Sequence, residues 1–455
     1  MTRTAVFVIL SLFLSGCANL YHHIDEGPNG NATTFRGIED YLKGENPLLV
    51  VQVHGMGDHS LESDCGTDPA LPSRNGRKPG TDKKPENLAL QDRIAKKLRY
   101  VPSGEYPPLI GEPIILRGTE RAGTYSVSKF VDPSGTRAPL FFSCITWGET
   151  SRTIKQGLLE LDGHFLEKNE NEAHRALLNR KAKQFVNQSF SDPVIYVGGM
   201  GPYIREVVWE GIMLSLRSHA RKERQAKGSN SYAAFFTPDG VRNQLPIAII
   251  SDSLGSRIVF DTLNAKIEFR PSIADEAIAA EALETKAAAD AALAKNLLYS
   301  VGSVYMLANQ LPLLELAYMK PPQAGTTLEN MAYQSTECYW PLLETSAIQV
   351  RASKPGRIEV IAFTDVNDAL SYRLSDRFKA RCGDRNSAGS LAGKGRDIAP
   401  EEAHPPLDFV NVTLPNARLR WLFVYSHLPK AHSSGFKNNK RAIEYMAWGT
   451  SHDGK

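Results

Sequence analysis

The chain has 455 residues, of which 42% are hydrophobic and 23% are charged, the balance of an ordinary globular protein with a sizeable core. That length fits two or three domains, or one large domain with insertions. The formal net charge is only +3, and the lysines and arginines are spread along the chain, which argues against a dedicated surface for nucleic acid.

The first residues have the layout of a secretory signal peptide. Arg3 precedes an apolar run, Ala5 to Leu14, that is too short to span a bilayer as a stable helix. The run ends in Leu14-Ser15-Gly16-Cys17, which resembles the lipobox of bacterial lipoproteins. The resemblance implies a signal peptide over residues 1–16, a lipid anchor on Cys17 in the cell envelope and, because Ala18 follows, sorting to the outer membrane. The alternative is a plain signal peptide that happens to contain a cysteine.

Elements of both kinds are predicted in the first third of the chain. Residues 17–45 are polar and are expected to form a tether, with some helix near residues 38–42. "PLLVVQVHG" is a continuous run rich in valine, typical of a buried parallel strand. An exposed loop is expected from Ser60 to Asn87, then a helix at "LALQDRIAKKLRY". Residues 110–146 are predicted to be extended, with a turn at "VDPSGT" and a last strand at "APLFFSCITW".

The rest of the chain alternates helices and strands. Helices are predicted around 151–188 and 203–226, and residues 272–298 are so rich in Ala, Glu and Lys that they indicate a helical excursion, either a lid or a solvent-exposed insertion. Residues 382–406 are predicted to be a loop. Further strands are expected within "LPIAIISDS", "VGSVYMLANQLPLL", "GRIEVIAFTD" and "LRWLFVYSHLPKAH".

This alternation predicts an α/β fold, a mostly parallel sheet flanked by helices. We expect one such domain over residues 46–450, with insertions at about 60–87 and 266–300. Its functional groups should collect where the parallel strands end.

The cysteines suit an exported protein. Apart from Cys17 there are four, Cys65, Cys144, Cys338 and Cys382, an even number that fits one or two disulfides. Their three possible pairings stay open, as does the alternative of buried free thiols. Their spacings contain no CxxC, so no zinc site is expected.

Ser253 lies between a predicted strand and a predicted helix, in Ser251-Asp252-Ser253-Leu254-Gly255. A strand, a small-x-Ser-x-Gly turn and a helix are the layout of a nucleophile elbow, which presents a serine hydroxyl at the end of the sheet. Ser251 stands where the usual pattern has glycine. An ordinary turn serine is the alternative interpretation.

A glycine-rich segment, His54-Gly55-Met56-Gly57, directly follows the strand at "LLVVQV". Acyl transfer needs N–H donors where the oxyanion forms, and such a loop can supply one of them. We expect that donor at Met56 or Gly57 and a second at Leu254. A plain tight turn that uses glycine for positive φ is the alternative.

A carboxylate and a histidine follow later strands. After "IEVIAF", both Asp365 and Asp368 could orient a histidine; Asp368 is preferred because it lies in the loop, while Asp365 at the strand end can order the turn. His432 is the predicted general base, and His427 is its rival.

The chain order Ser253, Asp368, His432, preceded by the glycine-rich segment, resembles the α/β-hydrolase superfamily, in particular its lipase- and esterase-like members. The resemblance covers roughly residues 48–440, although its specific part is four short motifs. It implies a serine hydrolase that cleaves carboxylic esters, and the expected lipid anchor makes it a membrane-tethered one whose esters include lipids. No metal or organic cofactor is expected, because the sequence has no HExxH, no P-loop and no paired CxxC, and the spread of charge argues against nucleic acid. Two alternatives remain: a catalytically inactive envelope lipoprotein that binds or scaffolds partners, and an acyltransferase or peptidase with the same triad.

Overall fold

The computed structural model describes residues 22–26, 32–43, 46–57, 89–103, 111–116, 120–159, 176, 179, 182–183, 185–227, 246–264, 301–318, 358–365, 368, 370–383, 407–415, 432 and 435–450. Cys17, Cys65, Cys338, His427 and the predicted insertions at 60–87 and 266–300 lie outside these residues.

The described strands form one sheet. They are β1 (His23–Ile24), β2 (Leu48–Val53), β3 (Val101–Pro102), β4 (Glu112–Leu116), β5 (Glu120–Val131), β6 (Leu140–Thr146), β7 (Ile247–Asp252), β8 (Val301–Leu307), β9 (Ile358–Thr364) and β10 (Leu407–Thr413).

The sheet is mixed but mostly parallel, in the order β1-β10-β9-β8-β7-β2-β6-β5-β3, with β4 beside β5. Neighbours from β10 through β6 are parallel, whereas β1, β3, β4 and β5 pair antiparallel at the two edges. The predicted α/β class with a mostly parallel sheet flanked by helices is therefore confirmed.

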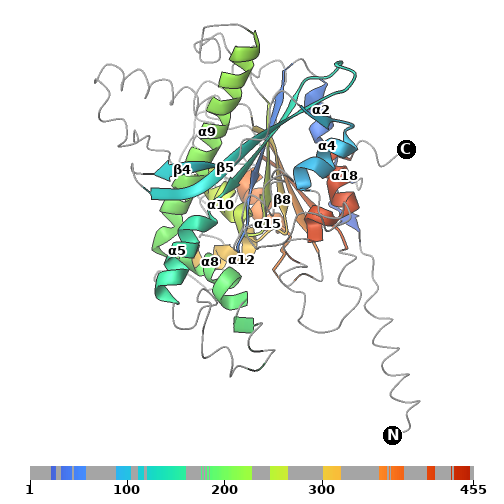
Figure 1. Ribbon diagram of the computed structural model, residues 1–455. Coiled ribbons are helices and arrows are strands. Elements are labelled where there is room, and N and C mark those ends of the chain that lie inside the picture. The colour runs from blue at the N-terminus through green and yellow to red at the C-terminus, as the bar shows by residue number, and fades with distance from the viewer. Residues whose placement is uncertain are drawn as a thin grey trace, which may run out of the picture.

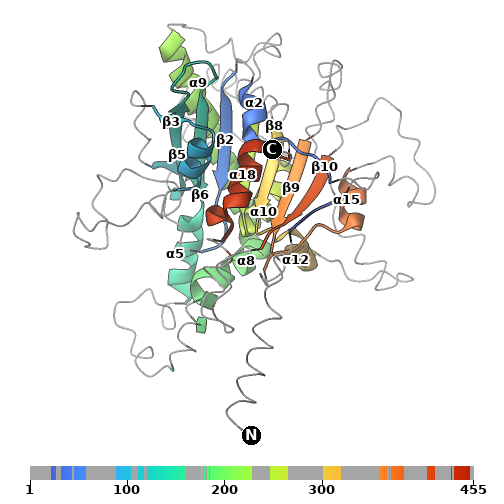
Figure 2. The same ribbon diagram turned by 90° about the vertical axis from the view of Figure 1, so that its right-hand side faces the viewer.

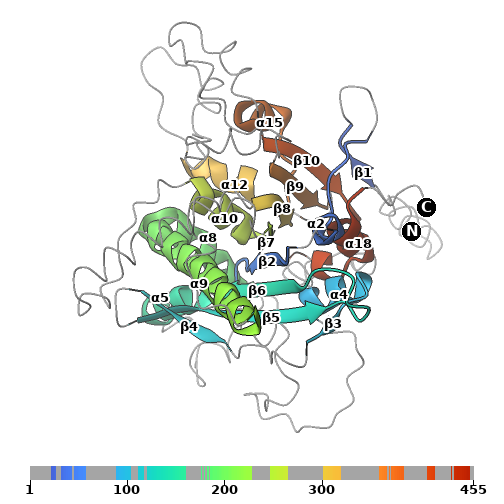
Figure 3. The ribbon, with the colours of Figure 1, turned by 90° about the horizontal axis from the view of Figure 1, so that it is seen from above.

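Helices cover both faces of the sheet. They are α2 (Ile38–Leu42), α4 (Leu90–Lys97), α5 (Gly148–Leu158), α8 (Ser191–Ile195), α9 (Gly201–Lys227), α10 (Leu254–Asn264), α12 (Leu311–Glu315), α15 (Asp376–Gly383) and α18 (Lys440–Trp448), with shorter turns η2 (Val186–Phe190), η3 (Tyr196–Met200), η7 (Leu316–Tyr318) and η11 (Phe436–Asn438). α9 and α10 lie on one face and α2, α4 and α18 on the other, as Figures 1 and 3 show. Each face has its own apolar core.

The central strands follow from their composition. Every residue of β2, β6 and β7 is buried, as expected for parallel strands covered on both faces. β10 was not predicted, because Asp408 and Asn411 interrupt its apolar pattern. The segment "LRWLFVYSHLPKAH", in which a strand is predicted, covers residues 419–432, and all of it except His432 lies outside the described part of the chain.

The segment expected to be a tether belongs partly to the body. β1 pairs with β10, and Phe35, Ile38 and Leu42 are buried in the core that α18 also lines. β1, β10 and α18 lie close together in Figure 2. The expectation of a tether over 17–45 is thus wrong for residues 22–26 and 32–43, because apolar side chains spaced along α2 bury themselves against the sheet.

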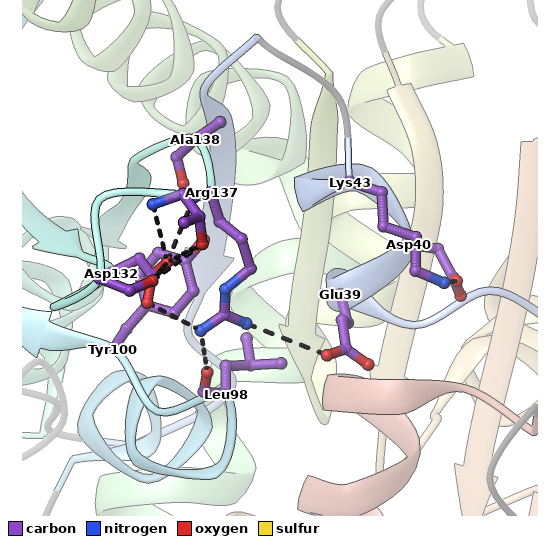
Figure 4. A network of polar contacts seen from close by, with 10 residues as sticks. Glu39, Asp40, Lys43, Leu98, Tyr100, Asp132, Arg137 and Ala138 are labelled. Atoms are coloured by element: carbon purple, nitrogen blue, oxygen red, sulfur yellow. Dashed lines mark hydrogen bonds and ion pairs between the residues drawn. The ribbon is translucent and has the colours of Figure 1, made fainter.

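The predicted turn at "VDPSGT" is present at the end of the sheet where β6 begins. The Asp132 carboxylate accepts hydrogen bonds from the backbone N–H groups of Thr136 and Arg137, and Arg137 donates to the Leu98 carbonyl oxygen at 2.8 Å while its guanidinium lies over the Tyr100 ring. Figure 4 shows this network reaching Glu39 on α2. The Ser134 hydroxyl, the Arg137 guanidinium and the Thr136 hydroxyl also donate to Asp132, and these side-chain contacts hold the pKa of Asp132 well below its usual range. The network ties α2, α4 and the β5–β6 turn together.

Candidate active site

Ser253 lies on a strained turn between β7 and α10. Its φ is 55°, in the left-handed region that a residue other than glycine rarely adopts. The turn is held by a hydrogen bond from the Ser253 N–H to the Leu307 carbonyl oxygen, 2.7 Å, and by one from the Ser256 N–H to the Ser253 carbonyl oxygen, 3.0 Å. Backbone strain of this kind at a strand-to-helix turn is what a nucleophile elbow requires.

Two glycines allow the turn to approach the end of β2. A Cβ on Gly55 would lie 2.5 Å from the Asp252 carbonyl oxygen, and one on Gly255 would lie 2.7 Å from the His54 carbonyl oxygen. Ser251, at the position where the usual pattern has glycine, is fully buried, with its hydroxyl 3.4 Å from the Tyr305 carbonyl oxygen. The serine is therefore accommodated there, while glycine is required at the other two positions.

Ser253, His432 and Asp368 form a continuous hydrogen-bonded chain. The Ser253 Oγ lies 2.6 Å from His432 Nε2, and His432 Nδ1 lies 2.6 Å from Asp368 Oδ2. All three residues are buried. The other Asp368 oxygen accepts a hydrogen bond from the Leu370 N–H at 3.0 Å. The three residues predicted from the chain order are thus brought together, although β7 and β9 are separated in the sheet by β8.

Asp365, the rival carboxylate, orders the turn that carries Asp368. Its N–H donates to the Ser371 hydroxyl at 3.2 Å, and its carbonyl oxygen accepts from the Asp368 N–H at 3.1 Å. Of the two carboxylates, Asp368 is the one bonded to the imidazole.

Gln310 is a fourth side chain at the histidine, and the sequence did not point to it. Its Nε2 lies 3.0 Å from His432 Nε2, the nitrogen that also faces Ser253. Gln310 Oε1 is buried and finds no hydrogen-bond partner within the described part of the chain. The one available signal was its place directly after the predicted strand in "VGSVYMLANQ", at the sheet edge where functional groups collect.

A buried ion pair supports the glycine-rich segment. The Gly57 N–H donates to Asp192 Oδ2 at 2.6 Å, and Asp192 Oδ1 lies 2.7 Å from Lys155 Nζ, with these two side chains 0% and 1% exposed. Lys155 also donates to the Gln188 carbonyl oxygen at 2.7 Å. Burial raises the pKa of Asp192, and the lysine and the Gly57 N–H oppose that rise.

This arrangement bears on the choice between Met56 and Gly57 as oxyanion donors. The Gly57 N–H donates to the Asp192 carboxylate, so the geometry favours Met56 of these two alternatives. Met56 is buried beside it. Leu254 is the first residue of α10, and its N–H therefore has no acceptor within the helix. Met56 and Leu254 remain the candidate donors.

A second ion pair joins the histidine region to the elbow. Lys437 Nζ, on η11, lies 3.0 Å from Asp252 Oδ2, and the Asp252 side chain is 2% exposed. Because Asp252 directly precedes Ser253, this contact fixes the segment after His432 against the turn that carries the serine.

Cys144 and Cys382 are both disulfide-bonded. β2, β7, β8 and β9 separate the strand of Cys144 from β10, against which α15 and Cys382 pack, a distance of about 20–25 Å at the usual strand spacing. Since bonded cysteines have Cα atoms within about 7 Å of one another, they are not bonded to each other.

No group of His, Cys, Asp or Glu in the described residues could hold a metal ion, and no helix among them is long and apolar enough to cross a bilayer. Comparisons with models of known protein families, with curated protein sequences and with solved structures gave no match.

Proposed function

We propose that this chain is a serine hydrolase of the α/β-hydrolase type, tethered to a membrane through Cys17, that cleaves carboxylic esters. The observation that carries the proposal is the hydrogen-bonded chain from Ser253 through His432 to Asp368. The strained serine turn and the mostly parallel sheet are further support.

The geometry suits the acylation step. His432 Nε2 accepts the Ser253 proton as the oxygen attacks the ester carbon, and Asp368 stabilises the imidazolium that forms. The N–H groups of Met56 and Leu254 would bind the oxyanion of the tetrahedral intermediate. His432 then returns its proton to the leaving alcohol, and water releases the acyl group by the reverse sequence of proton transfers. The Gln310 amide nitrogen lies 3.0 Å from the same His432 nitrogen.

The test is labelling of the full chain with a fluorophosphonate probe, which reacts with an activated serine by loss of fluoride. We expect rapid labelling of the wild type and none of Ser253→Ala. His432→Ala and Asp368→Asn should slow labelling by about 10³-fold or more, because triad members act as a unit. Wild-type chain that is folded but unlabelled would contradict the proposal and favour a binding or scaffolding role.

Two matched variants make this test specific. Ser251→Ala removes a buried serine two positions away, and Asp365→Asn changes the rival carboxylate while keeping the backbone N–H and carbonyl oxygen through which Asp365 orders the turn. Both should keep labelling within about threefold of wild type, because neither belongs to the hydrogen-bonded chain. Thermal unfolding of every variant separates loss of reactivity from loss of fold. An active serine would then be assigned to ester, amide or acyl-transfer chemistry by its substrates.

A further inference from the structure

Exposed apolar side chains gather at the end of the molecule that carries Ser253. Leu158 at the end of α5, Val194 on α8 and Leu316 on η7 are 81%, 61% and 64% exposed. Val186 and Phe190 of η2 are exposed beside α8. α5 follows β6, and α12 and η7 follow β8, so these residues lie beyond the carboxyl ends of the parallel strands. α5, α8 and α12 lie at one end of the body in both Figure 1 and Figure 2.

The carboxylates of these helices are neutralised. α8 contains one acidic residue, Asp192, which is paired with Lys155. α12 also contains one, Glu315, which lies 2.6 Å from an Arg257 nitrogen. Within the described helices α5, α8 and α12, therefore, every carboxylate is paired with a cation, which suits contact with lipid because lipid penalises unpaired charge. We call the exposed side chains of Leu158, Val186, Phe190, Val194 and Leu316 the apolar rim.

The chain enters the body at this same end. β1 runs antiparallel to β10, and His23 pairs with Thr413, the last residue of β10. Only six positions separate Cys17 from His23 in the sequence, a length that spans at most about 22 Å when fully extended. A lipid anchor at Cys17 would therefore hold the end with Ser253, not the opposite end, next to the bilayer.

We infer that the apolar rim docks on a lipid bilayer and turns the Ser253 site toward it. The ester substrate would then be a lipid that reaches the site from the membrane. The substrate statement rests on the proposed function, whereas the docking of the rim does not require catalysis.

The test uses the full chain in vesicles of phosphatidylethanolamine and phosphatidylglycerol that contain a trace of a phospholipid with a diazirine on its acyl chain. After irradiation, peptide mass spectrometry should find lipid adducts on the peptides that contain Leu158, Phe190 to Val194, and Leu316. Val101 is the control: it is an exposed valine at the other end of the sheet, where β3 meets the far end of β5. We expect at least about tenfold more adduct at the rim than at Val101.

Variants separate docking from chemistry. Ser253→Ala should give the same adducts as wild type, so a failure of the proposed function would leave this result intact. A chain with both Val194→Ser and Leu316→Ser should lose most adducts on the remaining rim residues and hydrolyse bilayer esters at least about tenfold more slowly. It should keep wild-type hydrolysis of a soluble short-chain ester, and Val101→Ser should change neither rate. Adducts equal at Val101 and the rim, or a rim covered by a second copy of the chain in cross-linking, would overturn the inference.

Discussion

The turn at Ser253 and the glycine-rich segment at residues 54–57 lie against each other, yet they are held in place by different means. The serine turn combines local contacts with a bond to the neighbouring strand: Ser256 bonds back to Ser253, α10 begins at once, and the Ser253 N–H donates to the Leu307 carbonyl oxygen. The glycine-rich segment depends on the side chain of Asp192, a residue 135 positions away. The local contacts of the first turn can therefore be predicted from a motif, whereas the side-chain contact that holds the second segment appears in no local pattern.

The largest expected effect comes from breaking the support of the glycine-rich segment. Lys155→Met leaves the Asp192 carboxylate buried without its cation, which should destabilise the fold by about 3–5 kcal/mol. Urea unfolding measures this loss. A loss below about 1 kcal/mol would mean that the buried ion pair contributes little to holding the segment.

The same variant should have a distinctive dependence on pH. Burial already raises the pKa of Asp192, and loss of the lysine removes the main opposing charge. With a folded-state pKa above the unfolded value of about 3.9, the carboxyl group favours the folded state when protonated. That contribution is fully present below the unfolded pKa and is lost as the pH rises through the folded pKa. Lys155→Met should therefore recover stability toward wild type as the pH falls from the folded-state pKa of Asp192 toward its unfolded value.

A double variant distinguishes folding from positioning. Lys155→Met with Asp192→Leu replaces the ion pair by apolar side chains and should restore most of the stability. It still leaves the Gly57 N–H without its carboxylate, so fluorophosphonate labelling should stay about 10–100-fold slower than wild type. Full recovery of labelling would show that the hydrogen bond to Gly57 does not position the segment.

The next largest loss of stability is expected from the contact between the Ser253 turn and the glycine-rich segment. Gly255→Ala places a Cβ 2.7 Å from the His54 carbonyl oxygen and 2.9 Å from that of Val53. Because both neighbours are backbone atoms of β2 or its end, relief requires moving the strand, at a cost of about 1–3 kcal/mol. Labelling of Ser253 should fall with it. Gly157→Ala is the matched control: its Cβ would meet nothing within 4 Å on α5, and it should stabilise the chain by up to about 1 kcal/mol.

The same distinction, between a local sequence pattern and a contact with a distant residue, decides which features of this structure the sequence predicts. The strands β2, β6, β7 and β9 can be predicted from the sequence, because a strand buried on both faces must be largely apolar along its length. Ser253 and Asp368 were found because they follow β7 and β9, and His432 was found because it ends the segment "LRWLFVYSHLPKAH", of which the rest lies outside the described residues. Asp192 and Lys155 were missed, since their pairing exists only after α5 and α8 have packed together.

The N-terminal segment was misjudged for a related reason. Its polar composition suggested a tether, but a single carboxylate connects it to three distant elements. Asp25 accepts hydrogen bonds from the Asn411 N–H and side-chain amide, both 2.9 Å, and forms ion pairs with Arg373 and Lys379. These contacts of the Asp25 carboxylate are with residues 348 to 386 positions away, so no local pattern in the sequence can indicate them.

Substitution of Asp25 should have the smallest effect on stability in this series, and it allows a direct comparison with Asp192. Each carboxylate binds a backbone N–H and a lysine, but Asp192 is fully buried whereas Arg373, one partner of Asp25, is 45% exposed. Burial raises the pKa of Asp25, but the contacts with Lys379 and the Asn411 N–H outweigh it, and the net pKa is lowered. Asp25→Asn should therefore cost only about 1 kcal/mol at pH 7.

The pH dependence should have the opposite sign to that of Lys155→Met. A lowered folded-state pKa gives stability that is present above the unfolded pKa and lost as the pH falls through the folded one. The difference in unfolding free energy between wild type and Asp25→Asn should thus shrink from pH 6 to pH 3 because the wild type loses stability, whereas the deficit of Lys155→Met shrinks on acidification because the variant gains stability. An unchanged difference across that range would mean that the Asp25 charge does not hold β1 to the sheet, and that packing of Ile24 and Phe35 does so instead.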